Sequence, residues 1–286
     1  MFKKKNILYG VSLLVLGMLG GCGSSQEQAS NNGEWEWERK VEIICPWGTG
    51  GGADTTTRTF ATALEKELGV PVVVNNRAGA GGVSGIEFGA KQPADGYTYI
   101  MSTPSPLLAQ IAGATDYDVY GALQPLVQMV HDVNIFVTSA KAPYNNYEEL
   151  MAYVEENPGK VKAGVMTITG LDAACVIGAF GDMKPIMSAS EKRLTLPGFE
   201  NVQCAGELGL DALFGPARGI FYVKGTPEEA LKSFETAAEK AVNSEFFQNW
   251  VKTEGLDQRP GWKNREDFKT QWDQDYKDLT ELFGKK

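Results

Sequence analysis

A glycine-rich run at residues 46–58, PWGTGGGADTTTR, has four glycines in five positions and is the first candidate for binding chemistry. The apolar, β-branched segment 41–45 before it predicts a buried strand, and apolar residues at helical spacing follow it as far as Gly69. The glycines therefore lie on a strand-to-helix turn, where backbone amides approach an anion closely and the helix start supplies unpaired N–H groups. Asp54 or a following threonine is expected to cap this helix, and a tight turn that binds nothing is the alternative.

A nucleotide site is the second chemistry to test, because Gly48, Gly50 and Ala53 satisfy the spacing G-x-G-x-x-A. That fingerprint needs an acidic residue at the end of the second strand, where this chain has Asn-Asn-Arg at 75–77. The glycines are also not followed by the Gly-Lys-Ser/Thr of a phosphate-binding loop. We therefore expect no cofactor. An enzyme that binds a nucleotide cofactor is kept as the alternative to a binding protein.

The sequence also offers no convincing set of residues for hydrolysis or for metal binding. His131, the one histidine, stands beside Asp132, but the chain has no G-x-S-x-G motif to supply a nucleophile, so a structural histidine is favoured. Apart from Cys22, the cysteines are Cys45, Cys175 and Cys204, and their spacing is not that of metal ligands. We expect buried thiols, and a disulfide between Cys175 and Cys204 stays open. We expect neither catalysis nor a metal site.

The N-terminus has the pattern of an export signal. Residues 1–22 combine three lysines, an apolar stretch too short to span a bilayer, and the sequence Leu-Gly-Gly-Cys, which resembles a bacterial lipobox with Cys22 as the lipidated residue. Residues 23–39 are polar and predict a flexible tether. The formal charge of −9 argues against nucleic acid as a partner. We expect an extracytoplasmic protein, lipid-anchored to the bacterial cell membrane, with an uncleaved anchor as the alternative.

The rest of the chain alternates short apolar runs with helical patterns, which predicts an α/β fold with mostly parallel sheets. Asn146, with Glu149 three residues on, predicts a helix start, and Thr226 with Glu229 predicts another. Apolar residues from Phe268 onward at spacings of three and four predict a final amphipathic helix that packs on a lobe. The other strands are expected at 70–74, 97–101, 160–166 and 219–225.

Four stretches in this order, PWGTGGGAD, NNRAGAGGVSG, PADGYTYIMSTPSPLL and RGIFYVKGTPEEA, carry a family resemblance. They resemble the Bug or TctC-like family, the extracytoplasmic substrate-binding proteins of tripartite tricarboxylate transporters. The resemblance implies a two-lobed, type II-like periplasmic-binding-protein fold whose lobes close over a small carboxylate. It implies a first lobe of residues 40–135 and 220–286, a second of 136–219, and hinges near 134–138 and 219–223.

The resemblance also implies which residues bind the ligand. The first-lobe set comprises backbone amides and an apolar wall, at Trp47, Thr49, Gly50, Gly51, Gly52, Ala53 and Asp54. The strand tip adds Ser102, Thr103 and Ser105, and a second-lobe turn adds Thr167, Thr169 and Gly170, with an ordinary turn and helix cap as the alternative for the last three. Arg77 is expected to serve loop structure, and the role of Arg218 is left open.

The chain departs from the family pattern after Phe180, where GDMKPIMSASEKRL follows at once. The resemblance implies a longer passage at this point, of which roughly fifty to sixty residues are absent here. That length is consistent with a second lobe that needs several α/β units to form its core. A trimmed functional lobe, a decayed paralogue and an internal deletion are the three explanations. The favoured function is a monomeric receptor that hands a carboxylate to membrane permease subunits, and the alternatives are a sensory or scavenging receptor and a non-functional paralogue.

Overall fold

The computed structural model describes residues 35–161, 183–210 and 215–283. The expected signal peptide, Cys22 and most of the tether precede the first range. Several other residues singled out by the sequence also lie outside the described ranges, namely Thr167, Thr169, Gly170, Cys175 and the strand expected at 160–166 from Lys162 onward.

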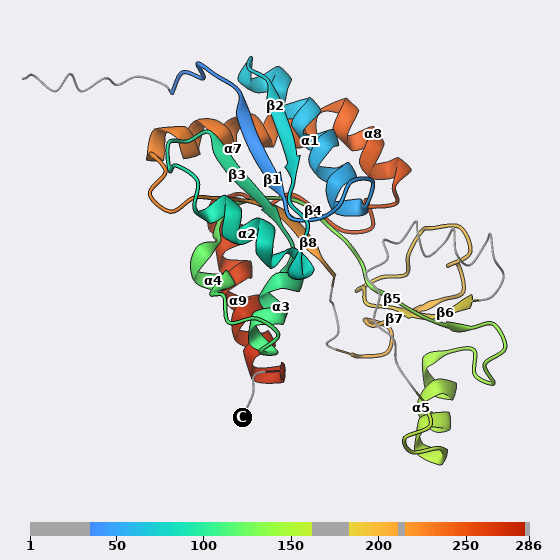
Figure 1. Ribbon diagram of the computed structural model, residues 1–286. Helices are drawn as coiled ribbons and strands as arrows, with labels where there is room; N and C mark the ends of the chain where they lie inside the picture. The colour runs from blue at the N-terminus through green and yellow to red at the C-terminus, as the bar shows by residue number, and fades with distance from the viewer. Residues whose placement is uncertain (1–34, 162–182, 211–214, 284–286) are drawn as a thin grey trace, which may run out of the picture. The chain divides into compact units, whose positions relative to one another are not determined.

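A five-stranded sheet with the order β2-β1-β3-β8-β4 forms the centre of the larger α/β region (Figure 1). Its strands are β1 (Val41–Cys45), β2 (Val72–Asn76), β3 (Thr98–Ser102), β4 (Gln124–His131) and β8 (Ala217–Tyr222). β1 pairs in parallel with β2 and β3, whereas β8 runs antiparallel to both β3 and β4. The expectation of mostly parallel sheets is therefore wrong, because an apolar run predicts a strand but not its direction.

A smaller sheet has the order β5-β6-β7, with β5 (Ile135–Ser139), β6 (Met183–Ser188) and β7 (Gln203–Cys204). The chain passes from β4 to β5 through residues 132–134. It returns to the larger sheet before Ala217, so β8 begins inside the range 136–219 expected for the second lobe. Residues 219–222, part of the expected second hinge, lie within β8 and pair with strands on both sides, which makes them a poor place for bending.

Helices cover both faces of the five-stranded sheet. One face packs against α1 (Gly52–Leu68), α7 (Glu228–Asn243) and α8 (Glu245–Thr253). The other packs against α2 (Val83–Ala90), α3 (Pro104–Ile111), α4 (Val119–Ala122) and α9 (Arg265–Phe283). Neighbouring strand residues alternate between the two cores, as Ile43 and Ile44 do, because side chains point to opposite faces along a strand.

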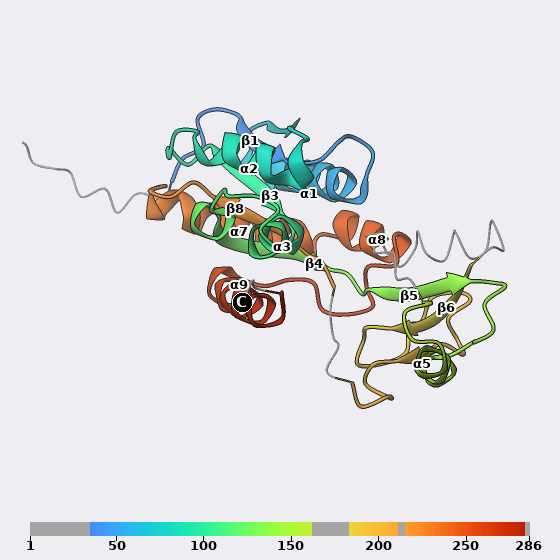
Figure 2. The same cartoon turned by 60° about the horizontal axis from the view of Figure 1, so that its bottom comes forward.

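The predicted helix ends have mixed outcomes. α5 (Tyr147–Glu156) begins as expected, because Glu149 N donates to Asn146 Oδ1 at 2.8 Å. The Thr226 cap is wrong, since its hydroxyl donates to Val223 O and α7 has no side-chain cap. Helix α9 packs as expected through buried Phe268 and Trp272, against β4 and α3 (Figure 2). None of the helices in the described part of the chain is long and apolar enough to span a bilayer.

Candidate anion site at the sheet edge

The carboxyl ends of the strands bring four segments to one edge of the five-stranded sheet. β1, β2 and β3 are parallel, and β4 shares their direction because both β3 and β4 run antiparallel to β8. The glycine run after β1, the loop after β2, the tip of β3 and the end of β4 therefore meet there, and β8 begins there. In open α/β sheets this edge is where ligands bind.

The glycine run leads into α1 with its backbone exposed. Residues 48–51 are all solvent-exposed, and Gly51 stands at the N-cap position with extended backbone. No side chain caps the helix, so the expected cap by Asp54 or a threonine is wrong. The threonine hydroxyls donate to carbonyls one turn back instead, as Thr56 Oγ1 does to Gly52 O at 2.6 Å. The N–H groups of the first helical turn, which have no partner within a helix, consequently face solvent beside glycines.

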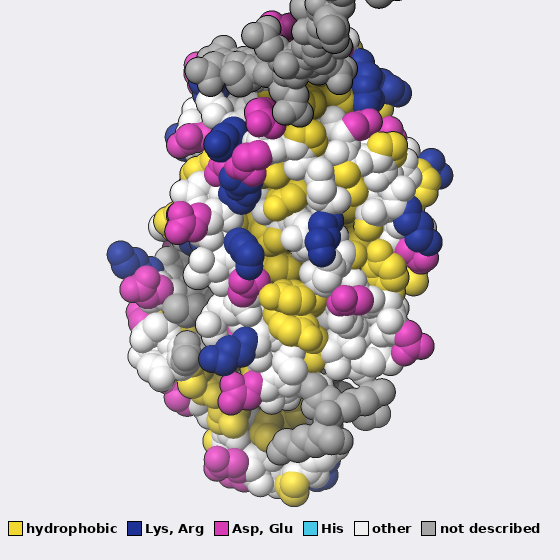
Figure 3. Space-filling model, turned by 90° about the vertical axis from the view of Figure 1, so that its left-hand side faces the viewer, with side chains coloured by type: hydrophobic (Ala, Val, Ile, Leu, Met, Phe, Trp, Pro, Cys, Tyr) yellow, Lys and Arg dark blue, Asp and Glu magenta, His cyan; other side chains and the backbone are white. Residues whose placement is uncertain are grey.

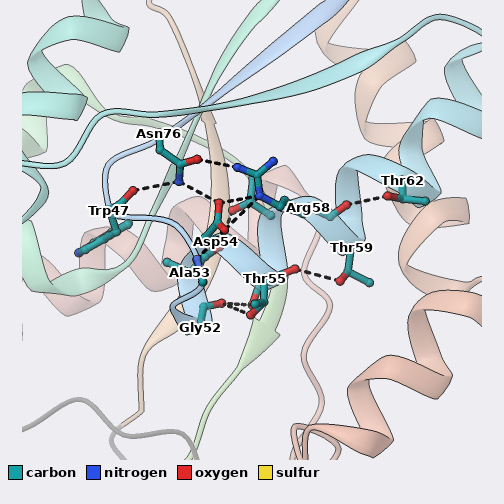
Figure 4. Close-up of polar contacts among 12 residues, drawn as sticks. Trp47, Gly52, Ala53, Asp54, Thr55, Arg58, Thr59, Thr62 and Asn76 are labelled. Carbon is teal, nitrogen blue, oxygen red and sulfur yellow. Dashed lines mark hydrogen bonds and ion pairs between the residues drawn. The ribbon is translucent and has the colours of Figure 1, made fainter.

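Asp54 holds the glycine run in shape from inside (Figure 4). Its carboxylate accepts from Gly50 N at 2.9 Å, from Asn76 Nδ2 at 2.8 Å and from Arg58 Nε at 3.0 Å. Asn76 Nδ2 also donates to Trp47 O at 3.0 Å, and its own oxygen accepts from Arg58. Burial raises the pKa of Asp54, but the hydrogen bonds from Arg58, Gly50 and Asn76 together lower it below its ordinary value. The Asp54 carboxylate therefore serves to fix the conformation of the loop.

Trp47 joins the glycine run to the two neighbouring loops. A Cβ on Gly82 would lie 3.2 Å from Trp47 Cζ2 and 3.1 Å from Pro106 Cγ. The backbone of the loop after β2 thus lies directly against the indole ring and the start of α3. Gly82 has φ +102, which L side chains rarely adopt, so a side chain there would bring both strain and a clash. The three loops form one packed unit around Trp47.

The tip of β3 uses most of its hydroxyls internally. Ser102 is fully buried and its hydroxyl donates to Thr103 O at 3.2 Å. Thr103 caps α3 by accepting from Ser105 N, with Pro104 at the first helical position. Of these three expected ligand residues, Ser105 is the one whose side chain is exposed.

Arg218, whose role the sequence leaves open, is buried at the same edge. Its Nη1 donates to Gly52 O at 3.0 Å and to Thr56 Oγ1 at 2.6 Å, and its Nη2 forms an ion pair with Asp132. Arg77, by contrast, stacks on the Phe88 ring at 4.3 Å, in keeping with the expected role in loop structure. The sequence did not single out Thr56, Arg58 or Asn76 as part of this edge; the four-residue spacing of Asp54 and Arg58 was the one signal available.

His131 is a largely buried ring beside Arg259. Burial, followed by the charges of Arg259 and Lys263, lowers the pKa of His131 to about 4, so the ring is neutral near pH 7. Its Nε2 lies 3.2 Å from Arg259 Nη1, while the neighbouring Asp132 pairs with Arg218. Within the described ranges no three His, Cys, Asp or Glu side chains gather in a way that could hold a metal ion.

The architecture is that of the periplasmic solute-binding proteins. A TctC solute-binding protein from Polaromonas superposes with a TM-score of 0.65 at 22% identity, over 86% of this chain and 98% of its own. Two structures from Rhodopseudomonas palustris, Rpa4515 with adipate and MatC with malate, give TM-scores of 0.71 and 0.68 at 20% and 19% identity. Each superposition covers 86% of this chain; it covers 96% of the Rpa4515 chain and 99% of the MatC chain. The expected two-lobed periplasmic-binding-type fold is confirmed.

Sequence comparison gives a more specific similarity than the fold does. Residues 56–177 match the model of the TctC family, the tripartite tricarboxylate transporter family receptor. The protein BugT of Bordetella pertussis is 41% identical over 127 residues, which are 43% of this chain and 39% of BugT, so the chain spans about two fifths of that relative. The resemblance inferred from the sequence motifs is thus confirmed.

A second relative bears on the length of the chain. A UPF0065 protein of Bordetella pertussis aligns at 23% identity over 266 positions, which include 77% of this chain and 81% of that protein. Because 77% of 286 residues is about 220, about 46 of the aligned positions have no residue in this chain. The alignment therefore contains gaps on the side of this chain.

Proposed function

We propose that this chain is an extracytoplasmic solute-binding protein that captures a small carboxylate and delivers it to a tripartite tricarboxylate-type transporter. The observation that carries the proposal is the first turn of α1, which presents glycine amides to solvent from a loop already fixed by Asp54. A carboxylate at this turn gains hydrogen bonds from N–H groups that lack partners and a favourable interaction with the helix dipole.

The comparisons support a carboxylate as the ligand class. The two Rhodopseudomonas palustris structures with this fold contain adipate and malate, which share a carboxylate group and differ in length and hydroxylation. The family is described as receptors of tricarboxylate transporters. The feature that these ligands share is therefore the carboxylate. The residues around the glycine run would determine which acid binds.

Local dipoles must supply the attraction, because the net charge of −9 opposes an anion at long range. On the face shown in Figure 3, acidic and basic side chains are interspersed, and the described basic side chains form no separate cluster. In the proposed site Thr49, Gly50, Gly51, Gly52, Ala53 and Asp54 contribute backbone groups, Trp47 the apolar wall, and Ser102, Thr103 and Ser105 the strand tip. Thr167, Thr169 and Gly170 complete it from the second lobe.

The remaining parts of the proposal concern the setting of the receptor. Residues 40–135 and 220–286 form the first lobe and 136–219 a shortened second lobe, and the ligand binds between them. Lipidation of Cys22 anchors a monomer to the outer face of the cell membrane through the tether at 23–39, next to the permease subunits.

A thermal-shift screen of the chain from Gly33 onward against mono-, di- and tricarboxylates tests this function. A ligand at a hundredfold excess over its Kd adds about 2.7 kcal/mol to the free energy of unfolding, which raises the Tm measurably. A Tm rise with one acid class supports the proposal. A cooperative melt that no acid shifts contradicts it.

A matched pair of glycine variants locates the site. A Cβ on Gly51 or on Gly48 meets no protein atom within 4 Å, and neither glycine has positive φ, so valine should be accommodated at both. Gly51→Val places a side chain over the first-turn amides and should abolish the acid-induced shift, whereas Gly48→Val should retain it. Equal retention by both variants would place the acid elsewhere.

A further inference from the structure

Arg218 is a buried cation directly behind the proposed carboxylate site. It lies on β8 and is 4% exposed. Its guanidinium packs against the first residue of α1, so that a Cβ added to Gly52 would lie 3.2 Å from Arg218 Nη2 and 3.4 Å from Nη1. This cation therefore contacts the last glycine of the run, at the first residue of α1.

The guanidinium connects that turn to a different part of the chain. Nη1 donates to Gly52 O at 3.0 Å and to Thr56 Oγ1 at 2.6 Å, both in the first turn of α1. Nη2 pairs with Asp132, which follows the last residue of β4 and is 2% exposed. The planar fork of an arginine holds such partners in fixed relative directions, which a lysine does not. One side chain thus sets the position of α1 relative to the end of β4.

Asp132 lies where the chain crosses between the two sheets. Asp132 N donates to Pro216 O at 3.2 Å, on the segment that returns to β8. A Cβ on Gly215 would lie 1.7 Å from Asp132 O, so the outgoing and returning segments are in direct contact there. Two residues on, Asn134 O accepts from Ala189 N at 2.8 Å, immediately after β6. The backbone around Asp132 is therefore one route by which movement of the smaller sheet can reach the larger one, beside the hydrogen bonds from Arg259 Nη2 to Ala189 O and from Thr195 N to Gln258 Oε1.

We propose that Arg218 is a positioning residue that couples the crossing segments to the first turn of α1, so that movement of the three-stranded sheet changes the affinity of that turn for its carboxylate. Separating a buried ion pair is strongly unfavourable, so Arg218 and Asp132 move together. Gly52 and Thr56 follow through their hydrogen bonds to Nη1. The link to ligand affinity rests on the proposed function; the mechanical coupling does not.

Hydrogen exchange of the full-length chain without ligand tests the coupling. Thr56→Val keeps the side-chain shape and removes the oxygen that accepts from Arg218, and Asp132→Asn removes the charge that pairs with it. Loss of a hydrogen bond to a charged group should speed local opening about tenfold. We expect Thr56→Val to speed exchange at Asp132 N and Ala189 N, and Asp132→Asn to speed exchange at the amides of residues 55–58.

Two conservative variants serve as controls. Thr57→Val removes a hydroxyl that donates to Ala53 O at 2.7 Å on the same turn, and it should leave exchange at Asp132 N unchanged. Thr56→Ser keeps the accepting oxygen and should restore slow exchange. In the double variant Thr56→Val/Asp132→Asn the two effects should be non-additive. Effects confined to each variant's own segment, or strictly additive effects, would overturn the proposal.

Binding of malate and adipate, measured by calorimetry, provides the second readout. Thr56→Val should raise the Kd of whichever acid binds about tenfold relative to Thr57→Val. An unchanged Kd despite coupled exchange would refute the link from Arg218 to affinity. If neither acid nor any member of the wider panel binds the unaltered chain, the proposed function fails, and the exchange data still decide whether Arg218 couples the two segments.

Discussion

The two sheets of this molecule are buried to very different depths. The five-stranded sheet lies between two apolar clusters that contain fully buried aromatic residues such as Tyr99, Phe234 and Trp272. In the described part of the three-stranded sheet the clusters are small, Phe136 is 51% exposed, and α5 has no buried residue. The larger sheet carries a core sufficient for an independent fold, whereas the described residues of the smaller one bury little apolar area.

This difference matters because the proposed site draws one wall from each sheet. The glycine run, Asp54 and Trp47 stand on the strongly packed side and keep their arrangement without help. The second wall is proposed from the smaller region, whose described part is weakly packed, and weak packing lowers the free energy of local opening. The three predictions below test whether the two sheets differ in stability as much as in burial.

The largest effect is expected from deleting a core phenylalanine. Phe234→Ala empties the centre of the larger cluster and should lower the global free energy of unfolding by about 3–5 kcal/mol. Phe199→Ala removes an equally buried ring from the small cluster around β7, and we expect about half that loss, confined to the smaller sheet. Denaturant titration with residue-level hydrogen exchange measures both; equal global losses would contradict the unequal division of stability.

A smaller effect is expected at the junction, from the protonation of His131. The pKa of His131 is lowered to about 4 in the folded chain, mainly by burial and then by Arg259 and Lys263. An unfolded histidine titrates near pH 6.5, so between about pH 6.5 and 4 the unfolded chain holds a proton that the folded chain lacks. The free energy of unfolding should therefore fall as pH falls through this window, by about 2–3 kcal/mol at pH 4.5.

Urea titrations between pH 7.5 and 4.5 measure this dependence, with His131→Gln as the matched variant. The glutamine variant should lose markedly less stability over this range, the remainder coming from carboxylates such as Asp54, whose pKa is lower in the folded chain than its ordinary value. An equally steep loss in His131→Gln would assign the pH dependence to other groups.

The smallest effect is expected from two helix caps, one on each side. Asn146→Ala removes the cap of α5 and Ser244→Ala that of α8, where Phe247 N donates to Ser244 Oγ at 3.2 Å. Each cap contributes about 1 kcal/mol. Because α5 buries no residue while α8 buries Phe247 and Val251, loss of the Asn146 cap should fray α5 locally, whereas α8 should stay protected. Exchange in α8 that rises as much as in α5 would contradict the contrast.

The sequence predicted what local chemistry determines. The strand at 41–45, the glycine turn and the Asn146 cap were all confirmed, because each depends on residues within a few positions of one another. The antiparallel direction of β8 was not predictable, since strand direction depends on where the chain returns rather than on the apolar pattern. Asp54 or a following threonine was expected to cap α1. The Asp54 oxygens instead accept hydrogen bonds from Gly50, Asn76 and Arg58.

The buried pair of Arg218 and Asp132 shows the same limit at long range. Its members are 86 residues apart, and Thr56 is 162 residues from Arg218, so no spacing rule connects them. An arginine within the apolar run ARGIFYV was the available signal. It left the role open because an apolar run predicts a buried strand but not the group that an arginine on it contacts. The assignment required the sheet order, which places β8 beside β4 with α1 above their ends.

The rigidity of the loop held by Asp54 also has a kinetic consequence. A loop that must order itself on binding slows association and spends binding free energy on lost conformational freedom. Here Gly50, Asn76 and Arg58 fix the turn before any acid arrives. For a carboxylate that binds at this turn, encounter should proceed close to the rate of diffusion against the opposing charge, and the lifetime of the complex should depend on how quickly the second wall opens.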